Sequence, residues 1–265
     1  MRTLDRTSIL YSCYQQRSRE GEQFIAEHVF GVIISGTQKL FVDGETYEFG
    51  PGDLRFFRKD QLCRFEKEPP PGGEFLSVSV FLSKDTLRAM SIELDLHADG
   101  PYTGDAIKRL APNKLLQNYI DSLSPYLHGS DTAIDPALTN LKVREAVMLL
   151  LQTNPDLKNA LFDLSEPGKI DLQSFMNANY RFNVDISRFA YLTGRSLATF
   201  KRDFERIYHT SPSRWLQQQR LNDAYFLIKQ KGKPVSDVYL EVGFKDLSHF
   251  SFAFKKVYGV SPTMV

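Results

Sequence analysis

The sequence predicts an α+β multidomain protein, in which a β-barrel with appended helices is followed by an all-α domain. Short apolar segments separated by Gly, Pro and Asp turns fill residues 8–90. From Thr103 the apolar period becomes helical, and near the carboxyl end one stretch repeats an earlier one at an offset of 50 residues. We therefore expect a barrel over 1–95, a helical region over 96–165 and an all-α domain over 166–265.

The first domain consists of short strands. One apolar run extends from Val29 to Ile34 and another from Phe75 to Leu82. Between them in the sequence lies a turn at Pro51-Gly52-Asp53. Such strands and turns are typical of an antiparallel sandwich or a small barrel. Aromatic side chains of these strands could line an interior that binds a small effector, although core packing is the simpler explanation for any one of them. They are Phe30, Phe41, Tyr47, Phe49, Phe56 and Phe57.

Two apolar helical stripes follow the strands. The first comprises Leu115, Leu116, Tyr119, Ile120 and Leu123. The second comprises Leu138, Leu141, Val143, Ala146, Val147, Leu149, Leu150 and Leu151. Because the second is apolar on most sides, we expect it to be largely buried, either against its own barrel or against a second copy of the chain. Pro167 and Gly168, among charged neighbours, then predict a domain boundary.

The last domain contains two copies of one pattern. When Phe204 is placed over Phe254, like residues coincide in pairs: Phe200 with Phe250, Ile207 with Val257, Tyr208 with Tyr258, and Ser211-Pro212 with Ser261-Pro262. Each copy predicts a short helix, a turn at Gly194 or Gly243, and a longer helix. We expect Asp185, Ser196 and Asp246 to cap these helices. Two helices joined in this way form a helix-turn-helix, whose second helix can lie in the major groove of DNA.

A single helix is expected between the two copies. It begins at Ser211-Pro212, with proline in the first turn, and ends at Gly232. A helix of about 18 residues spans roughly 27 Å. It would hold the two recognition helices at a fixed separation close to the ~34 Å of one DNA turn.

The motifs of the last domain are Ala190-x3-Gly194-x-Ser196, Phe200 to Phe204, Ser211-Pro212, Arg220-Leu221-x2-Ala224, Gly243-Phe244-x-Asp246-x-Ser248-x-Phe250, Phe254-Lys255-Lys256 and Gly259-x-Ser261-Pro262. With these spacings unbroken, the domain resembles the DNA-binding domain of the AraC/XylS family of bacterial transcription regulators. Tyr239 departs from the family, which usually has a small Ala there, and so do Leu247 and Phe252, where polar or basic side chains are frequent.

A second resemblance lies in the first domain. Its segment Gly44-x2-Tyr47-x-Phe49-x-Pro51-Gly52-Asp53 is similar to the second half of the cupin motif and to the sensory domain of many AraC-type regulators. The resemblances imply a cupin-like β-barrel and a sequence-specific regulator of double-stranded promoter DNA. They also imply activation through RNA polymerase, a homodimer, and control by a small-molecule effector or a regulatory protein.

The resemblance places the family's base-reading residues of the first recognition helix on Ala198, Lys201 and Arg202. Lys and Arg can donate to guanine, and an Ala methyl can contact the thymine methyl. Thr199 is a further exposed candidate, and Arg195 and Arg206 are expected to contact phosphates. Asp203 is also expected on the exposed side of this helix. In the second copy the exposed candidates are Lys245, Leu247, Ser248, His249 and Ser251, with Lys255 and Lys256 facing the DNA backbone.

The net charge of +1 conceals an asymmetry between the two parts of the chain. Residues 166–265 hold 15 Lys/Arg and 9 Asp/Glu, a net charge of +6, whereas residues 1–165 hold 18 and 23, a net charge of −5. A basic part beside an acidic part indicates that only one of them faces a polyanion.

Other function classes lack a matching pattern. No apolar run reaches membrane length and no signal peptide is recognisable, so we expect a cytoplasmic protein without membrane association. Cys13 and Cys63 are too few for a disulfide framework or a zinc site. The alternative of a metal-dependent cupin enzyme needs clustered ligands, but His28 stands alone in the barrel region. We therefore expect no catalytic residue, metal site or cofactor.

Overall fold

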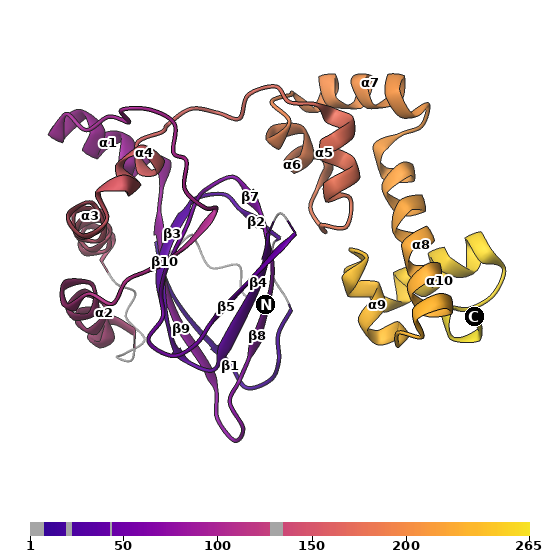
Figure 1. The fold of residues 1–265 in the computed structure, drawn as a ribbon, viewed down its shortest axis with the longest axis horizontal. Helices are drawn as coiled ribbons and strands as arrows, with labels where there is room; N and C mark the ends of the chain where they lie inside the picture. Colours follow the sequence, from indigo (N-terminus) through magenta and orange to yellow (C-terminus); the bar gives the residue numbers. More distant parts are fainter. Residues whose placement is uncertain (1–7, 20–22, 43, 128–134) are drawn as a thin grey trace. The chain divides into compact units, whose positions relative to one another are not determined.

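The computed structural model describes residues 8–19, 23–42, 44–127 and 135–265 (Figure 1). The chain divides into two compact units, which we treat separately. Unit 1 comprises residues 1–21 and 25–165, and unit 2 comprises residues 22–24 and 166–265.

Unit 1 is built on antiparallel strands. A five-stranded sheet has the order β1 (Ile9–Tyr14), β9 (Phe75–Leu82), β3 (His28–Ser35), β6 (Leu54–Phe57) and β10 (Ile107–Leu110). A three-stranded sheet has the order β5 (Glu45–Phe49), β4 (Thr37–Val42) and β8 (Arg64–Glu68), and the short strands β2 (Phe24–Ile25) and β7 (Gln61–Leu62) form a separate pair.

In the described residues these sheets remain separate and do not close into one hydrogen-bonded barrel. The chain passes from the first sheet to the second between β3 and β4. There a register shift between Ile33 and Ser35 is followed by Gly36, whose φ is +81°. A bulge of this kind bends a strand away from its hydrogen-bonded neighbour, so the chain leaves the first sheet here and continues in the second. The cupin-like part is therefore a sandwich of two sheets.

Alternation along the strands makes two apolar layers. Phe30, Val32 and Val80 pack towards the helices of unit 1, whereas Ile33 and Phe75 pack between the two sheets, in the space that we call the interlayer.

The six aromatic candidates for an effector site therefore do not share one interior. Tyr47, Phe49 and Phe57 pack into the interlayer, but Phe30 and Phe56 face the helices. Phe41 alternates with the interlayer residues of its strand, and the guanidinium of Arg64 covers its ring.

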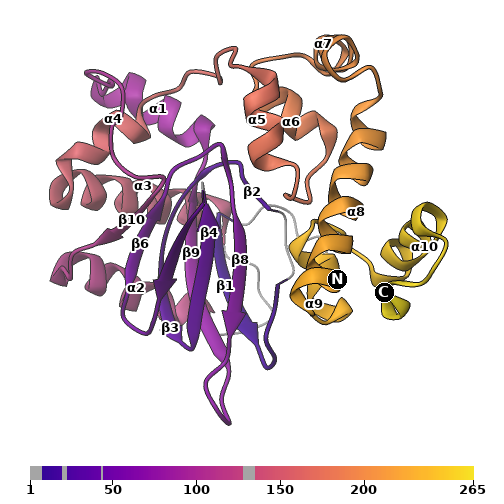
Figure 2. The same cartoon turned by 45° about the vertical axis from the view of Figure 1, so that its right-hand side comes forward.

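The helices of unit 1 cover the five-stranded sheet on one face (Figures 1 and 2). They are α1 (Lys84–Leu94), α2 (Lys114–Leu127), α3 (Pro136–Thr153), the 3₁₀ turn η1 (Pro155–Leu157) and α4 (Lys158–Leu161). Helix α1 thus falls in the range 1–95, which was expected to be barrel. Strand β10 falls in the range 96–165, which was expected to be helical, because it pairs with β6 and completes the edge of the sheet.

Helix α3 is buried on one side only. Val143, Ala146, Val147 and Leu150 pack in the core, whereas Leu141 is 62% exposed. Leu138, Leu149 and Leu151 are half-buried, so within this chain the expected stripe is largely buried except at Leu141.

Unit 2 contains the two expected helix-turn-helix pairs. Helices α6 (Ile186–Leu192) and α7 (Leu197–Tyr208) form the first, and α9 (Val235–Glu241) and α10 (Leu247–Tyr258) form the second. Helix α8 (Pro212–Lys231) runs between them (Figures 1 and 2). Helix α5 (Leu172–Asn179) precedes the first pair and the 3₁₀ turn η2 (Pro262–Met264) ends the chain.

Helix α8 supplies part of both cores. At its start, Trp215 contacts Phe204 and Tyr208 at ring separations of 5.6 and 4.6 Å. Further along, Leu221 and Ala224 are buried among the residues of the second pair. With 20 residues, α8 is about 30 Å long.

The helix caps follow the sequence with one exception. The Ser196 hydroxyl accepts the backbone N–H of Thr199 at 3.3 Å, and the Asp246 carboxylate accepts that of His249 at 2.7 Å. Asp185 stands at the capping position of α6, but its side chain makes no capping hydrogen bond.

The two turns share one backbone geometry. The N–H of Arg195 donates to the carbonyl of Ala190 at 3.0 Å, and the N–H of Phe244 donates to that of Tyr239 at 2.8 Å. The turn thus tolerates Tyr239 in place of Ala, and its ring lies 6.5 Å from that of Phe250.

Gly194 is required for two reasons. Its φ is +64°, and a Cβ there would lie 2.4 Å from the backbone carbon of Gly168. Gly232, at the end of α8, has a similar φ of +61° but no atom within 4 Å of the same position. A substitution at Gly232 therefore introduces backbone strain alone, whereas the same substitution at Gly194 introduces both strain and a steric collision.

We expect Gly194→Ala to destabilise unit 2 more than Gly232→Ala. A left-handed Ala costs about 1–2 kcal/mol at either position, and the collision with Gly168 adds about 1–3 kcal/mol at position 194 only. Denaturant unfolding followed by the fluorescence of Trp215, the single tryptophan of the chain, measures this in unit 2. Equal losses in the two variants would show that the Gly168 contact is unimportant.

Candidate nucleic-acid interface

Helix α7 exposes the residues that the sequence singled out. Ala198, Lys201, Arg202 and Arg206 are exposed, the side chains of Arg202 and Arg206 by 77% and 78%. Phe200 and Phe204 hold the opposite side in the core. Because the helix is anchored by this apolar side, its cationic side faces solvent.

The side chain of Thr199 is less exposed than expected. It is half-buried, and its hydroxyl accepts a hydrogen bond from the Ser196 hydroxyl at 3.0 Å. Thr199 therefore belongs to the capped first turn of α7 and lies at the margin of the exposed surface.

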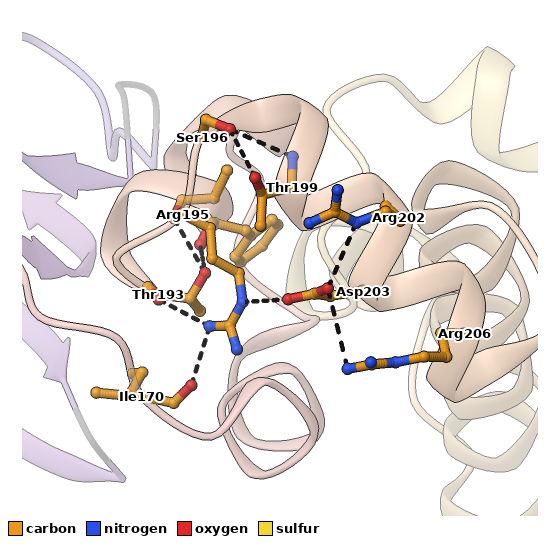
Figure 3. Close-up of polar contacts among 10 residues, drawn as sticks. Ile170, Thr193, Arg195, Ser196, Thr199, Arg202, Asp203 and Arg206 are labelled. Atoms are coloured by element: carbon orange, nitrogen blue, oxygen red, sulfur yellow. Dashed lines mark hydrogen bonds and ion pairs between the residues drawn. The ribbon is translucent and has the colours of Figure 1, made fainter.

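Arg195 and Asp203 differ from the sequence expectation (Figure 3). The Arg195 side chain is only 8% exposed, and its Nε donates to Asp203 at 3.2 Å. Its Nη1 donates to the carbonyls of Thr193 at 2.7 Å and Ile170 at 2.9 Å. A guanidinium committed to these acceptors is not a free phosphate anchor, and Asp203 is buried beside it instead of lying on the exposed side.

The carboxylate of Asp203 lies close to three arginine side chains. The hydrogen bond from Arg195 holds the pKa of Asp203 below its ordinary value. Its other oxygen lies 3.9 Å from nitrogens of Arg202 and Arg206, whose side chains reach out into solvent (Figure 3). The buried carboxylate thus lies between one internal cation and two exposed ones.

The second copy fills the same place with apolar groups. Phe244 follows the turn glycine as Arg195 does, and Ala253 stands 50 residues after Asp203. Both are buried, and the Phe244 ring lies 5.1 Å from that of Phe250. Lys245 is the extra residue of this copy, and it is exposed.

Helix α10 presents a different surface from α7. Leu247, Ser248, His249 and Lys255 are exposed, and Ser251 is half-buried. These are the residues that the sequence predicted, together with the exposed Lys256.

Phe252 is a residue of this surface that was not among the predicted contacts. It is 71% exposed and stands 50 residues after Arg202, so the repeat itself contains the signal. On a helix it shares the side opposite Phe250 with Ser248, four residues earlier. Where the first copy offers a guanidinium, the second offers a phenyl ring.

The described residues contain no group of three or more His, Cys, Asp or Glu side chains that could hold a metal ion. His28 is buried and stacks on Phe56 at 5.4 Å. Its Nδ1 accepts the backbone N–H of Lys59 at 3.2 Å, and burial lowers its pKa to about 3. His28 is therefore a neutral core residue. Among the helices that the structure describes, none is long and apolar enough to cross a membrane.

Comparison with known proteins adds independent findings. The helix-turn-helix domain family matches residues 189–265, and the ExsA N-terminal regulatory domain family matches residues 28–160. The chain is 31% identical over 237 residues to the HTH-type transcriptional regulator ExsA of Pseudomonas aeruginosa, covering 88% of this chain and 83% of ExsA. It is 28% identical over 243 residues to the virulence regulon transcriptional activator VirF of Yersinia enterocolitica, covering 88% and 86%. A solved structure of ToxT from Vibrio cholerae covers 98% of this chain and is itself covered to 97%, with 13% identity and a TM-score of 0.46.

The internal ion pair of the first copy leads to a prediction. Asp203→Ala leaves the Arg195 guanidinium buried without its carboxylate, so we expect the melting temperature of unit 2 to fall by several degrees. Adding Arg195→Phe imitates the Phe244 and Ala253 pair and should recover most of the loss. Glu205→Ala, an exposed carboxylate on the same helix, is the matched control and should have little effect. Thermal unfolding followed by Trp215 fluorescence checks this, and a double variant no better than Asp203→Ala would contradict it.

Proposed function

Since the chain belongs to the AraC family of helix-turn-helix transcription regulators, we propose that it binds double-stranded promoter DNA sequence-specifically through α7 and α10. The observation that supports this most directly is the pair of helix-turn-helix units at the two ends of α8. Their turns share one geometry, and their second helices expose polar and cationic side chains. The net charge of +6 on residues 166–265 suits a polyanionic partner.

We assign base reading in the first half-site to Ala198, Lys201 and Arg202. Lys201 and Arg202 donate to guanine O6 and N7, and Ala198 contacts a thymine methyl. Thr199 lies beside the phosphates at the start of α7, where exposed backbone N–H groups favour an anion. Arg206, near the end of α7, neutralises a phosphate. Arg195 takes no part in this surface, because its side chain is buried and its Nε and Nη1 donate to acceptors inside the fold.

In the second half-site the contacts are of another kind. Phe252 and Leu247 present apolar surface to thymine methyl groups, while Ser248, His249 and Ser251 are available for polar contacts to bases. Lys245, Lys255 and Lys256 neutralise phosphates around α10. The two halves of the operator are therefore recognised by different chemistry.

We propose further that the protein is an activator, because the similar protein VirF is a transcriptional activator. An activator of this kind would act by contacting RNA polymerase. Unit 1 would control it in response to a small effector or a regulatory protein, and the exposed side of α3 would join two copies as a homodimer. Cys13 and Cys63 are free, which suits a reducing cytoplasm.

Selection of binding sites from random duplex DNA by the full-length chain tests the proposed function. We expect the selected sites to be protected on two major-groove faces about one helical turn apart. Binding should weaken linearly in a plot of log K against log salt concentration. Binding that is indifferent to both salt and sequence would exclude a sequence-specific regulator.

On the selected site, Arg206→Ala should weaken binding to all sequences alike and reduce the salt slope by about 1. Arg202→Ala and Lys201→Ala should each cost about 1–3 kcal/mol at one guanine and relax the preference for that base. Fluorescence anisotropy titrations at several salt concentrations measure both effects. If the three variants behave alike, the division into base-reading and phosphate-binding residues is wrong.

Base analogues separate the two halves of the site. Replacing guanine by 7-deazaguanine should weaken binding in the α7 half, and Arg202→Ala should remove this sensitivity. Replacing thymine by deoxyuracil should weaken binding a few-fold in the α10 half, because about one methyl group loses its apolar contact, and Phe252→Ala should remove that sensitivity. Phe226→Ala, an exposed phenylalanine of α8, is the matched control. Sensitivity to deoxyuracil that persists in Phe252→Ala would rule out Phe252 as the contact.

A further inference from the structure

Arg55 occupies an unusual position in unit 1. It lies in β6, with β3 on one side and β10 on the other. Its neighbours Leu54 and Phe56 face the helices, so Arg55 points into the interlayer together with Phe57, whose ring centroid lies 5.4 Å from the guanidinium carbon. The residue opposite Arg55 on β3 is Gly31, which has no side chain.

The guanidinium of Arg55 has no carboxylate of its own. The residue is 1% exposed, and its Nε and Nη1 have no hydrogen-bond partner within the described structure. Asp53 is the carboxylate whose charge acts on Arg55, but it pairs with Arg109 and accepts the backbone N–H of Gly50 at 2.7 Å. Donors as strong as a guanidinium are rarely left unsatisfied in a protein interior.

A second cation faces the same interlayer from the opposite sheet. Lys67 of β8 stands two residues after Phe65, which packs into the interlayer core, so both side chains lie on the same face of the strand. The Lys67 ammonium lies 4.4, 5.5 and 5.7 Å from the ring centroids of Tyr14, Phe65 and Phe75. Burial, with repulsion from Arg55 as the smaller cause, lowers the pKa of Lys67 to about 8, so it remains largely protonated at neutral pH.

Lys67 donates to the Tyr14 hydroxyl at 3.4 Å, but two neutral polar groups of the interlayer lack hydrogen-bond partners in the described residues. Gln38 lies beside Lys67 in the register of β4 and β8, and its Oε1 has no hydrogen-bond partner in the described residues. The hydroxyl of Ser77 on β9 is likewise buried without a partner there. Two cations and two neutral polar groups thus face an otherwise apolar interlayer, and Asp53, the carboxylate whose charge acts on Arg55, is already paired with Arg109.

We propose that the interlayer of unit 1 binds a small anion through a carboxylate or phosphate group held by Arg55 and Lys67. A planar guanidinium donates to two oxygens of either group, and a nearby ammonium neutralises the remaining charge. Gln38 and Ser77 supply further polar contacts. This assigns a chemical class to the effector of the proposed function, and its regulatory consequence rests on that function.

Calorimetric titration of the full-length chain in a zwitterionic buffer tests the site directly. The probes are inorganic phosphate, acetate and octanoate, with 1-octanol as the uncharged control. We expect saturable binding of one equivalent of at least one anion and none of 1-octanol. A preference for phosphate would identify a phosphorylated ligand, and a preference for octanoate over acetate would identify a carboxylate with an apolar body. If no anion binds saturably, the proposal fails.

Variants assign the binding to the interlayer. Arg55→Met and Lys67→Met should each weaken the binding at least about tenfold, because each removes a charged donor. Arg88→Met, an exposed arginine of α1, is the matched control and should leave the binding unchanged. Binding that survives both interlayer variants would overturn the assignment.

The melting temperature of the Arg55→Met variant without anion shows whether Arg55 binds a ligand or stabilises the fold. Removing an unpaired buried charge is neutral or stabilising, so Arg55→Met should melt at or above the wild-type temperature in the absence of anion. A clearly lower melting temperature would mean that Arg55 serves the packing of the sandwich, and the proposal would be wrong. DNA binding is measured separately, so loss of the regulator function and loss of the anion site are distinguishable.

Discussion

The DNA-binding unit depends on helix α8, because one helix completes two separate cores. Trp215 packs against Phe204 and Tyr208 in the first core, and Leu221 and Ala224 pack in the second. A helix gains most of its stability from such packing, so neither helix-turn-helix could keep its fold if α8 were displaced. The same dependence keeps α7 and α10 at opposite ends of one rigid element, which suits two successive faces of a duplex.

Within this frame the two copies solve one packing problem in different ways. The place after the turn glycine is filled by the Arg195–Asp203 ion pair in the first copy and by Phe244 with Ala253 in the second. The choice has electrostatic consequences on the surface. In the first copy a buried carboxylate lies next to Arg202 and Arg206, whereas in the second no carboxylate occupies the equivalent position. The chemistry of each recognition surface is thus coupled to the core beneath it.

Unit 1 likewise holds charge inside and apolar surface outside, but its buried charges are not paired with each other. Arg55 and Lys67 face the interlayer, while Leu141 and Met148 of α3 are exposed. Both features cost folding free energy in an isolated chain, the first through desolvation and the second through apolar hydration. An anion in the interlayer and a second copy on α3 would each offset one of these costs. Such an anion would influence DNA binding only by favouring one arrangement of the protein over another.

The sequence by itself determined the features that depend on neighbouring residues. Helical periods, turn glycines, the caps Ser196 and Asp246 and the 50-residue repeat are local, so unit 2 and its family could be predicted. The strands of unit 1 were also recognisable, but which strands pair and where the ladder breaks depends on residues far apart in the chain. Only the tertiary structure decided that Arg195 turns inward to Asp203, that Phe252 lies exposed, and that Nε and Nη1 of Arg55 lack hydrogen-bond partners in the described residues. The physical reason is that the exposure and pairing of a charged side chain depend on every element packed around it.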